Sequence, residues 1–239
     1  MSSLILVRHG QARSFEPDSD QLSLTGEVQT RALANFWIQQ NQSFHEVYCG
    51  TLKRQRHTAE IAGRCFNEAG LSWPHLQTTS DLNEYDAKGI INLLVPALAE
   101  RDRGFRELVA DFERKKDSPE RNRSFQKMFE AVTSVWLQEE IEVDGVESWS
   151  TFRSRVRTVL ERIISREDSG RRIVVFTSGG VIGLIVQTAL GAPEMKMLDI
   201  NWRIRNSSLT EFIFSRGRFS LDSFNATPHL NELSLITYR

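Results

Sequence analysis

Apolar residues occur along this chain in short continuous runs that alternate with longer amphipathic stretches. The runs at residues 4–7 and 173–176 are rich in Val and Ile, which is typical of strands buried on both faces of a parallel sheet. Shorter apolar segments bounded by turn residues predict the remaining strands: residues 46–49, a strand ending near Leu82, and a hairpin formed by residues 206–214 and 218–224.

Apolar residues at helical spacing fill the stretches between the predicted strands. Thr25 and Thr51 precede two of these stretches and are expected to be N-caps, because a hydroxyl oxygen accepts a free N–H of the first turn. Residues 89–142 are helical in pattern but dense in charge, and we expect a helical cap inserted in a single domain that spans residues 1–239. Further helices are predicted at residues 147–164 and 179–190.

The alternation of strands and helices with short turns predicts the fold class. It indicates an α/β three-layer sandwich with a mostly parallel central sheet and helices on both faces. The strands at residues 4–7 and 173–176 run into turns that contain Arg8, His9 and Gly10, and Ser178 and Gly179. If these strands are parallel, their carboxyl ends share one pocket, which is where open α/β sheets bind ligands.

Composition narrows the classes of function. Of the 239 residues, 40% are hydrophobic and 26% charged, as in an ordinary soluble globular protein. The formal net charge of -1 lacks the basic excess of a nucleic-acid-binding protein. No apolar stretch suits a signal peptide or a membrane span, so we expect no membrane partner and a cytoplasmic location. Cys49 and Cys65 show no disulfide or zinc spacing and are expected to be inert.

Chemically useful side chains are expected at the ends of the predicted strands: Arg8, His9, Arg54 and Glu84. Guanidinium groups match phosphate oxygens and neutralise charge in a transition state. A neutral imidazole can attack phosphorus, and a carboxylic acid can protonate the departing alkoxide. The combination indicates phosphoryl chemistry with neither a metal ion nor a cofactor.

Other interpretations of these residues stay open at this point. His9 alone is also compatible with a structural histidine at a strand end, and Arg54 with a cation on the surface of a helix. Asp81 and Asp86 lie close enough in sequence to Glu84 to be alternative carboxylates.

Several segments together make the sequence resemble the histidine phosphatase superfamily, the group that includes the cofactor-dependent phosphoglycerate mutases. The segment Leu-Val-Arg-His-Gly at residues 6–10 is similar to the family signature. The resemblance leaves residues 89–142 unmatched and extends over most of the remaining chain. The other similar segments are residues 22–29, 52–59, 82–84, 147–156 and 225–230.

The resemblance implies a role for each candidate residue. His9 would be the phosphorylated nucleophile, and Arg8 and Arg54 would bind the phosphate. Glu84 would be the general acid and later the general base. The fold that the resemblance implies is the phosphoglycerate mutase-like one, which agrees with the α/β sandwich predicted from the pattern of strands and helices.

The sequence also departs from the family pattern. The family normally has a second histidine where this chain has Ser178, and we expect Ser178 and Gly179 to contact phosphate in its place. A serine hydroxyl donates a hydrogen bond but carries no positive charge. Gln11 and Ala12 stand where many members have an acidic residue and a serine or threonine, which disfavours a mutase reaction.

We therefore predict a metal-independent phosphatase that hydrolyses a phosphomonoester through phosphorylated His9. The alternative is a catalytically weak family member that binds phosphorylated ligands or partners in a regulatory role, and Ser178 motivates it. The expected ligand is a small phosphorylated substrate or inorganic phosphate, and no nucleic-acid partner is expected. Specificity is assigned to residues 89–142 and to the loop at residues 11–21, whereas neither the substrate nor the oligomeric state is readable from the sequence.

Overall fold

The computed structural model describes residues 1–13, 16, 18–165 and 169–238, so that residues 14, 15 and 17 of the predicted loop lie outside the described residues. Contacts divide the chain into two compact units. The sheet unit comprises Met1–Glu84 and Arg155–Arg239, and the helical unit comprises Tyr85–Ser154. The single domain with an insert at about residues 89–142 stays a prediction.

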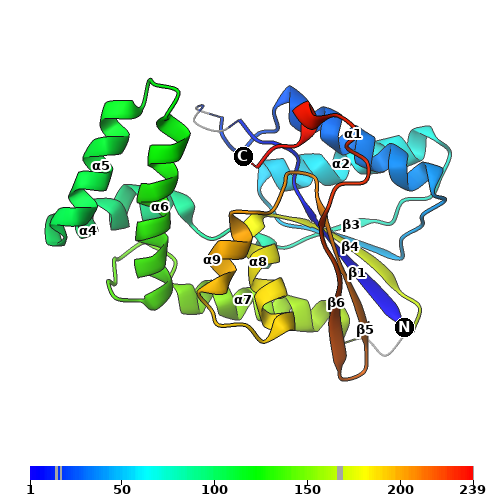
Figure 1. Ribbon diagram of the computed structural model, residues 1–239. Helices are drawn as coiled ribbons and strands as arrows, with labels where there is room; N and C mark the ends of the chain where they lie inside the picture. The colour runs from blue at the N-terminus through cyan, green and yellow to red at the C-terminus, as the bar shows by residue number, and fades with distance from the viewer. Residues whose placement is uncertain (14–15, 17, 166–168, 239) are drawn as a thin grey trace. The chain divides into compact units, whose positions relative to one another are not determined.

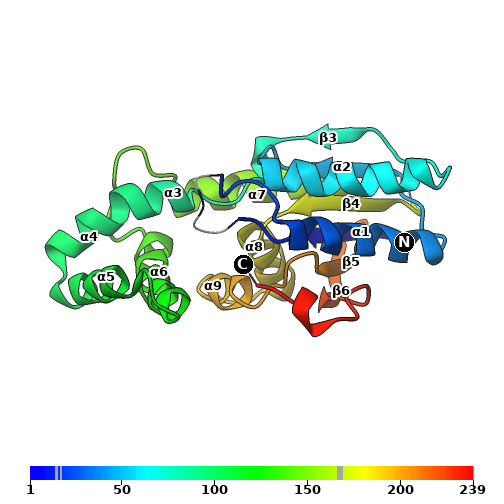
Figure 2. The ribbon, with the colours of Figure 1, turned by 90° about the horizontal axis from the view of Figure 1, so that it is seen from above.

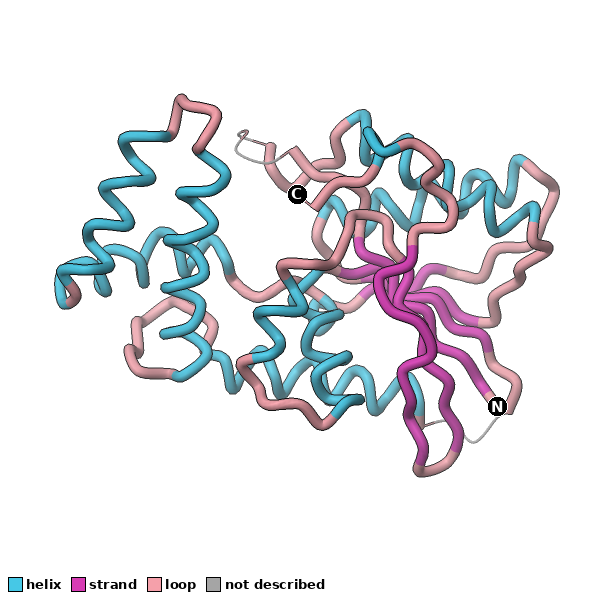
Figure 3. Tube along the Cα trace, viewed as in Figure 1, coloured by secondary structure: helices cyan, strands magenta, loops and turns pink. Residues whose placement is uncertain are grey.

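The described residues of the sheet unit form one six-stranded sheet with the order β3-β2-β4-β1-β5-β6 (Figures 1 and 3). Strands β1, β2, β3 and β4 are parallel, β5 pairs antiparallel with β1, and β6 pairs antiparallel with β5. The predicted α/β fold with a mostly parallel sheet is therefore confirmed. The strand bounds are β1 Ser2–Arg8, β2 Glu46–Cys49, β3 Leu76–Thr78, β4 Arg172–Thr177, β5 Leu209–Ser215 and β6 Arg218–Ala226.

Helices cover both faces of this sheet. In Figures 1 and 2, α1 and α2 lie on one face and α8 lies on the other. Ile5 and Val7 of β1 belong to the apolar cluster that includes α1 and α2, whereas Leu4 and Leu6 are buried on the opposite face. Burial on both faces explains the uninterrupted apolar run of β1. The helix bounds are α1 Leu24–Gln39, α2 Lys53–Glu68, α7 Trp149–Ile164, α8 Gly179–Leu190 and α9 Lys196–Asn201.

The helical unit has an aromatic cluster of its own. The rings of Tyr85 and Trp136 have centroids 5.0 Å apart, and those of Trp136 and Trp149 are 5.5 Å apart. Phe152 also packs against this cluster, with its centroid 5.9 Å from that of Trp136. The helices expected in this region are present: α3 Ala87–Gly89, a π-helical turn Ile90–Leu94, α4 Val95–Arg101, α5 Arg103–Lys115 and α6 Arg121–Gln138.

The predicted N-cap of α1 is wrong. Thr25 lies inside the helix, which begins at Leu24. The Ser23 hydroxyl accepts the backbone N–H of Gly26 at 3.1 Å and therefore caps the helix instead.

The predicted N-cap of α2 is also wrong, because Thr51 is bound elsewhere. Its backbone N–H donates to Asn83 Oδ1 at 2.7 Å, and its hydroxyl accepts from Asn83 Nδ2 at 2.8 Å. The helix begins at Lys53, whose N–H donates to the Asp20 carboxylate at 2.9 Å. A side chain from a distant loop thus supplies the cap.

The third strand is shorter than predicted. After β3, residues Ser80–Leu82 form a 3₁₀ helix, because Thr79 Oγ1 accepts the Asp81 N–H at 3.3 Å and starts a turn. Glu84 lies in the loop beyond, as the sequence predicts.

Both cysteines of the chain, Cys49 and Cys65, are buried free thiols. Burial raises the pKa of Cys49 to about 12, so its thiol stays protonated, in line with the inert role predicted for it. Within the described part of the chain, none of the helices is both long enough and apolar enough to cross a membrane.

Two leucines of α1 provide a test of the packing of this helix. Leu33 is fully buried, whereas Leu24 is 79% exposed. Leu33→Ala is expected to lower the free energy of unfolding by about 2–5 kcal/mol, because it removes apolar contacts and leaves a cavity. Leu24→Ala should lower it by less than about 0.5 kcal/mol. Urea-unfolding curves measure both values, and equal losses would contradict the packing of α1 on the sheet.

Candidate active site

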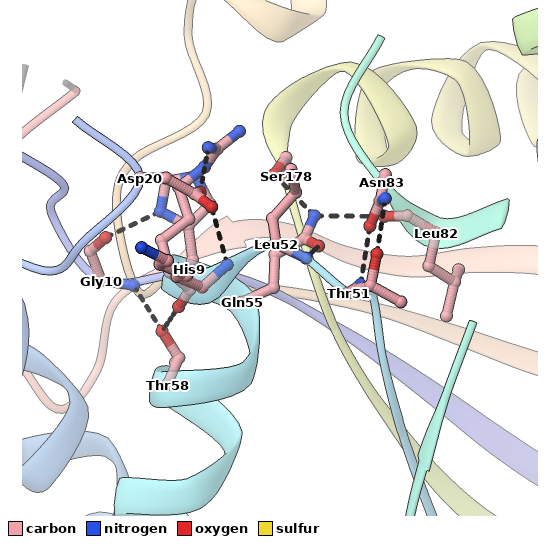
Figure 4. A network of polar contacts seen from close by, with 12 residues as sticks. His9, Gly10, Asp20, Thr51, Leu52, Gln55, Thr58, Leu82, Asn83 and Ser178 are labelled. Atoms are coloured by element: carbon pink, nitrogen blue, oxygen red, sulfur yellow. Dashed lines mark hydrogen bonds and ion pairs between the residues drawn. The ribbon is translucent and has the colours of Figure 1, made fainter. Parts of the chain in front are cut away.

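The candidate site lies where β1 and β4 end side by side. Arg8 is the register partner of Thr177 in this parallel pair, and the His9 N–H donates to Thr177 O at 2.9 Å. The turns after the two strands, which contain His9 and Ser178, therefore emerge at the same edge of the sheet (Figure 4). This is the arrangement expected of a ligand site in an open α/β sheet.

His9 is held as a neutral imidazole in a defined tautomer. His9 is buried, with 5% of its surface exposed, and its Nδ1 lies 2.7 Å from Gly10 O. A carbonyl only accepts hydrogen bonds, so Nδ1 carries the proton and Nε2 has a lone pair, which accepts from Arg54 Nε at 3.1 Å. Burial, with the charges of Arg54 and Arg8, holds the pKa of His9 well below its ordinary value.

Arg54 lies in the first turn of α2 and contacts both His9 and a carboxylate. Its Nη1 donates to Asp20 Oδ1 at 2.6 Å, while Asp20 Oδ2 accepts the Lys53 N–H at 2.9 Å. The positive end of a helix and a guanidinium group together form an anion site. Asp20 occupies that site in this structure (Figure 4).

Arg8 extends from the last position of β1. Its Nη1 donates to Ile204 O, and its charge, after burial and the charge of Arg54, contributes to the lowered pKa of His9. Ser207 fixes the backbone behind both residues, because its N–H donates to Arg8 O at 3.0 Å and to His9 O at 3.2 Å. Ser207 has a φ of 60°, a left-handed conformation that is costly for a residue with a Cβ.

His229 lies behind the site and supports Ser207. Its Nε2 is 3.1 Å from Ser207 Oγ, and the ring is buried. Burial lowers the pKa of His229 to about 4, so the imidazole is neutral at pH 7.

Ser178 precedes α8 and is completely buried. Its Oγ accepts from Gln55 Nε2 at 2.8 Å, and the same amide group donates to Leu82 O at 3.2 Å (Figure 4). Because Ser178 Oγ accepts in this contact, its own proton is oriented away from Gln55. A Cβ on the next residue, Gly179, would lie 2.3 Å from Asn201 Oδ1, so a larger residue there would displace the Asn201 side chain.

Glu84 reaches the N-terminus of α8. Its carboxylate oxygens accept the Gly180 N–H at 3.0 and 3.1 Å. The backbone donor and the helix dipole both stabilise the ionised carboxylate. His9 thus contacts Arg54, and the next residue of α2, Gln55, contacts Ser178. Glu84 binds the N–H of Gly180, two residues after Ser178.

The comparison with known families agrees with this arrangement. The sequence model of the histidine phosphatase superfamily (branch 1) matches residues 4–135 and, in an overlapping second match, residues 94–227. The chain belongs to the histidine phosphatase superfamily. A search of curated protein sequences returned no match.

Solved structures confirm the histidine phosphatase fold. A phosphoglycerate mutase from Bacillus anthracis superposes with a TM-score of 0.62 at 16% identity, over 95% of this chain and 94% of that one. Bacillus stearothermophilus YhfR gives 0.64 at 16% identity, over 96% and 99% of the two chains. A mycobacterial glucosyl-3-phosphoglycerate phosphatase in complex with inorganic phosphate gives 0.61 at 19% identity, over 96% and 99%.

Two residues of this candidate site were missed by the sequence analysis. Gln55 is completely buried, and it lies on the same helical face as Thr58 and Ala59, so the apolar periodicity of α2 could have indicated its direction. Asp20 offers no local signal, because its contact with Arg54 spans 34 positions of the sequence. Among the described residues, no group of three His, Cys, Asp or Glu side chains could hold a metal ion.

The pairing of Asp20 with Arg54 leads to a prediction about anion binding. Asp20→Asn keeps an oxygen for the Lys53 N–H but removes the charge that competes with phosphate for Arg54. The dissociation constant for inorganic phosphate is expected to fall about threefold, because a partly exposed ion pair contributes up to about 1 kcal/mol. Isothermal titration calorimetry measures this change.

The exposed Asp18 of the same loop provides the matched control. Asp18→Asn removes the same charge without a contact to Arg54 and should leave the affinity for phosphate nearly unchanged. Weaker phosphate binding by Asp20→Asn would show instead that Asp20 holds Arg54 in the orientation that binds the anion.

Proposed function

We propose that this protein is a metal-independent phosphatase that hydrolyses a small phosphomonoester through a phosphohistidine at His9. The observation that carries the proposal is the state of His9. The imidazole is neutral, its Nδ1 proton is directed to Gly10 O, and its Nε2 lone pair lies among the charges of Arg8 and Arg54. A nucleophile for phosphorus needs this lone pair, and its anionic target needs these cations.

In the first step, His9 Nε2 attacks phosphorus, and the bond from phosphorus to the ester oxygen breaks. Since Nε2 accepts from Arg54 Nε in this structure, Arg54 must turn toward the phosphoryl oxygens before the attack. The same turn exchanges the Asp20 carboxylate for the phosphate. Arg8 and Arg54 then neutralise the charge that develops on the phosphoryl oxygens.

Glu84 acts as a general acid in the first step and as a general base in the second. It gives its proton to the departing oxygen, and the resulting carboxylate is stabilised by the Gly180 N–H. A water molecule then loses a proton to Glu84 and attacks the phosphohistidine. Inorganic phosphate leaves, and His9 returns to its neutral form.

Ser178 and Gly179 complete the proposed phosphate site. The Ser178 proton, which Gln55 does not use, is available to a phosphoryl oxygen. Water as the acceptor fits this chain better than a mutase reaction, because Gln11 and Ala12 replace the residues common in many members of the family. The proposed ligand is therefore a phosphomonoester or inorganic phosphate, and the proposed reaction uses no cofactor. The proposed location of the protein is the cytoplasm.

The second candidate function is that of a regulatory protein that binds phosphorylated ligands with little turnover. Two observations favour it over an ordinary phosphatase. Ser178 supplies no positive charge, and Arg54 is already paired with Asp20. The complete loss of one transition-state donor costs about 10²–10³ in rate, and the Ser178 hydroxyl, as an uncharged replacement, should reduce that cost only in part.

Turnover of 4-nitrophenyl phosphate distinguishes the two functions. The wild-type protein is expected to hydrolyse it, and His9→Ala is expected to lower kcat by at least about 10³-fold, because it removes the nucleophile. An alkaline quench of wild type during turnover should retain a phosphoryl group on His9, which peptide mass spectrometry locates.

His75, which is exposed, provides the control for these measurements, and His75→Ala should keep full activity. Activity that survives His9→Ala would contradict the phosphohistidine mechanism. Binding of inorganic phosphate without turnover of any phosphomonoester in a broad panel would support the regulatory function. In that case, Ser178→His is expected to raise turnover, since it restores an imidazole at that position.

A further inference from the structure

One half-buried arginine binds backbone carbonyls of residues 80–84, the segment that carries Glu84. Arg155, near the middle of α7, donates through Nη1 to Asn83 O at 2.8 Å and to Asp81 O at 3.0 Å. The same Nη1 lies 3.4 Å from Ser80 O. Its Nη2 donates to the carbonyl of Glu84 itself at 3.2 Å. A single guanidinium group thus binds the segment along its length.

The remaining carbonyl of this segment, that of Leu82, is bound by side chains of β4 and α2. Leu82 O accepts from Thr177 Oγ1 at 2.7 Å and from Gln55 Nε2 at 3.2 Å. Asn83 is tied in addition to Thr51 through its side chain. The carbonyls of Ser80 to Glu84 therefore all face a side-chain donor, although the segment forms no strand.

These hydrogen bonds fix the position of Glu84, because they hold both its backbone and its side chain. Arg155 binds its backbone carbonyl, and Gly180 binds its carboxylate. A general acid works only within hydrogen-bond distance of the departing oxygen, and an error of about 1 Å in placement is costly. Glu84 is the last residue of the sheet unit before the helical unit, and Arg155 is the first residue after it.

We propose that Arg155 is a positioning residue that holds Glu84 in place to protonate the leaving group. This inference rests on the proposed function, because it assigns a support to the proposed general acid. The planar guanidinium group suits the task, since its two Nη atoms reach neighbouring carbonyls at the same time. A lysine ammonium group keeps the charge but is a single point, and it cannot bridge Asn83 O and Glu84 O in this way.

The test uses the basicity of the leaving group. 4-Nitrophenolate leaves phosphorus with little help, whereas phenolate needs a proton from the general acid. The ratio of kcat/KM for phenyl phosphate to that for 4-nitrophenyl phosphate therefore reports on Glu84 alone. Arg155→Lys and Arg155→Ala are expected to lower this ratio about tenfold, and Glu84→Gln should lower it at least as much.

A merely structural role for Arg155 would lower both rates equally and leave the ratio unchanged. Arg162 of the same helix serves as the matched control. It lies 3.7 Å from the Asp81 carboxylate and is 60% exposed, so it touches the same segment without binding its carbonyls. Arg162→Lys and Arg162→Ala should leave the ratio unchanged. Arg155→Lys keeps the experiment informative if Arg155→Ala fails to fold.

Two failures of the experiment are distinguishable. If Glu84→Gln leaves the ratio unchanged, Glu84 is not the general acid, and both its proposed role and that of Arg155 are overturned, whereas the phosphohistidine mechanism is tested separately by His9→Ala. If Glu84→Gln lowers the ratio but Arg155→Lys and Arg155→Ala do not, only the role of Arg155 is overturned. The double variant Glu84→Gln with Arg155→Lys should show no lower ratio than Glu84→Gln alone, because the support acts through the acid.

Discussion

In the parallel pair of β1 and β4, Arg8 lies opposite Thr177, and the His9 N–H donates to the Thr177 carbonyl. The rest of the site depends on this pairing. It makes the chain leave both strands at one edge of the sheet, so that His9 and Ser178 follow neighbouring strands. Because β2 pairs with the other side of β4, the helix that carries Arg54 begins at the same edge.

The electrostatic state of the site follows from this convergence. His9 is buried with two guanidinium groups nearby, and protonation of its imidazole would add a third positive charge at a high cost. The same surroundings favour an anion. In this structure, the carboxylate of Asp20 binds Arg54 and a carbonyl binds Arg8, so both cations have ligands. A phosphate group brings more charge than Asp20 and is matched to the guanidinium geometry.

The sequence predicted those features that depend on local pattern. The apolar runs of β1 and β4 identified buried parallel strands, and Arg54 follows the end of β2, where the sequence predicted it. Placement of Glu84 in a loop was correct even though the strand before it is shorter than predicted. The roles of His9, Arg54 and Glu84 stay predictions, because the fold fixes their positions and leaves their chemistry to experiment.

The features that the sequence did not predict arise from contacts between distant residues. Asn83 binds Thr51 and leaves the cap of α2 to Asp20, which no local rule indicates. Gln55 donates to Ser178, which is 123 positions away in the sequence. Arg155, which binds the carbonyls of the segment from Ser80 to Glu84, is separated from that segment by the whole helical unit. Local propensity cannot indicate which of these distant groups forms the hydrogen bond, since they come close together only in the folded state.

A crystal structure of the protein with orthovanadate tests the central claim most directly, since vanadate adopts the five-coordinate geometry of phosphoryl transfer. We predict vanadium bonded to His9 Nε2, with its equatorial oxygens bound by Arg8 and Arg54 and with Asp20 released from Arg54. Vanadate bound elsewhere, with His9 Nε2 still accepting from Arg54 Nε, would contradict the account of His9 as the nucleophile.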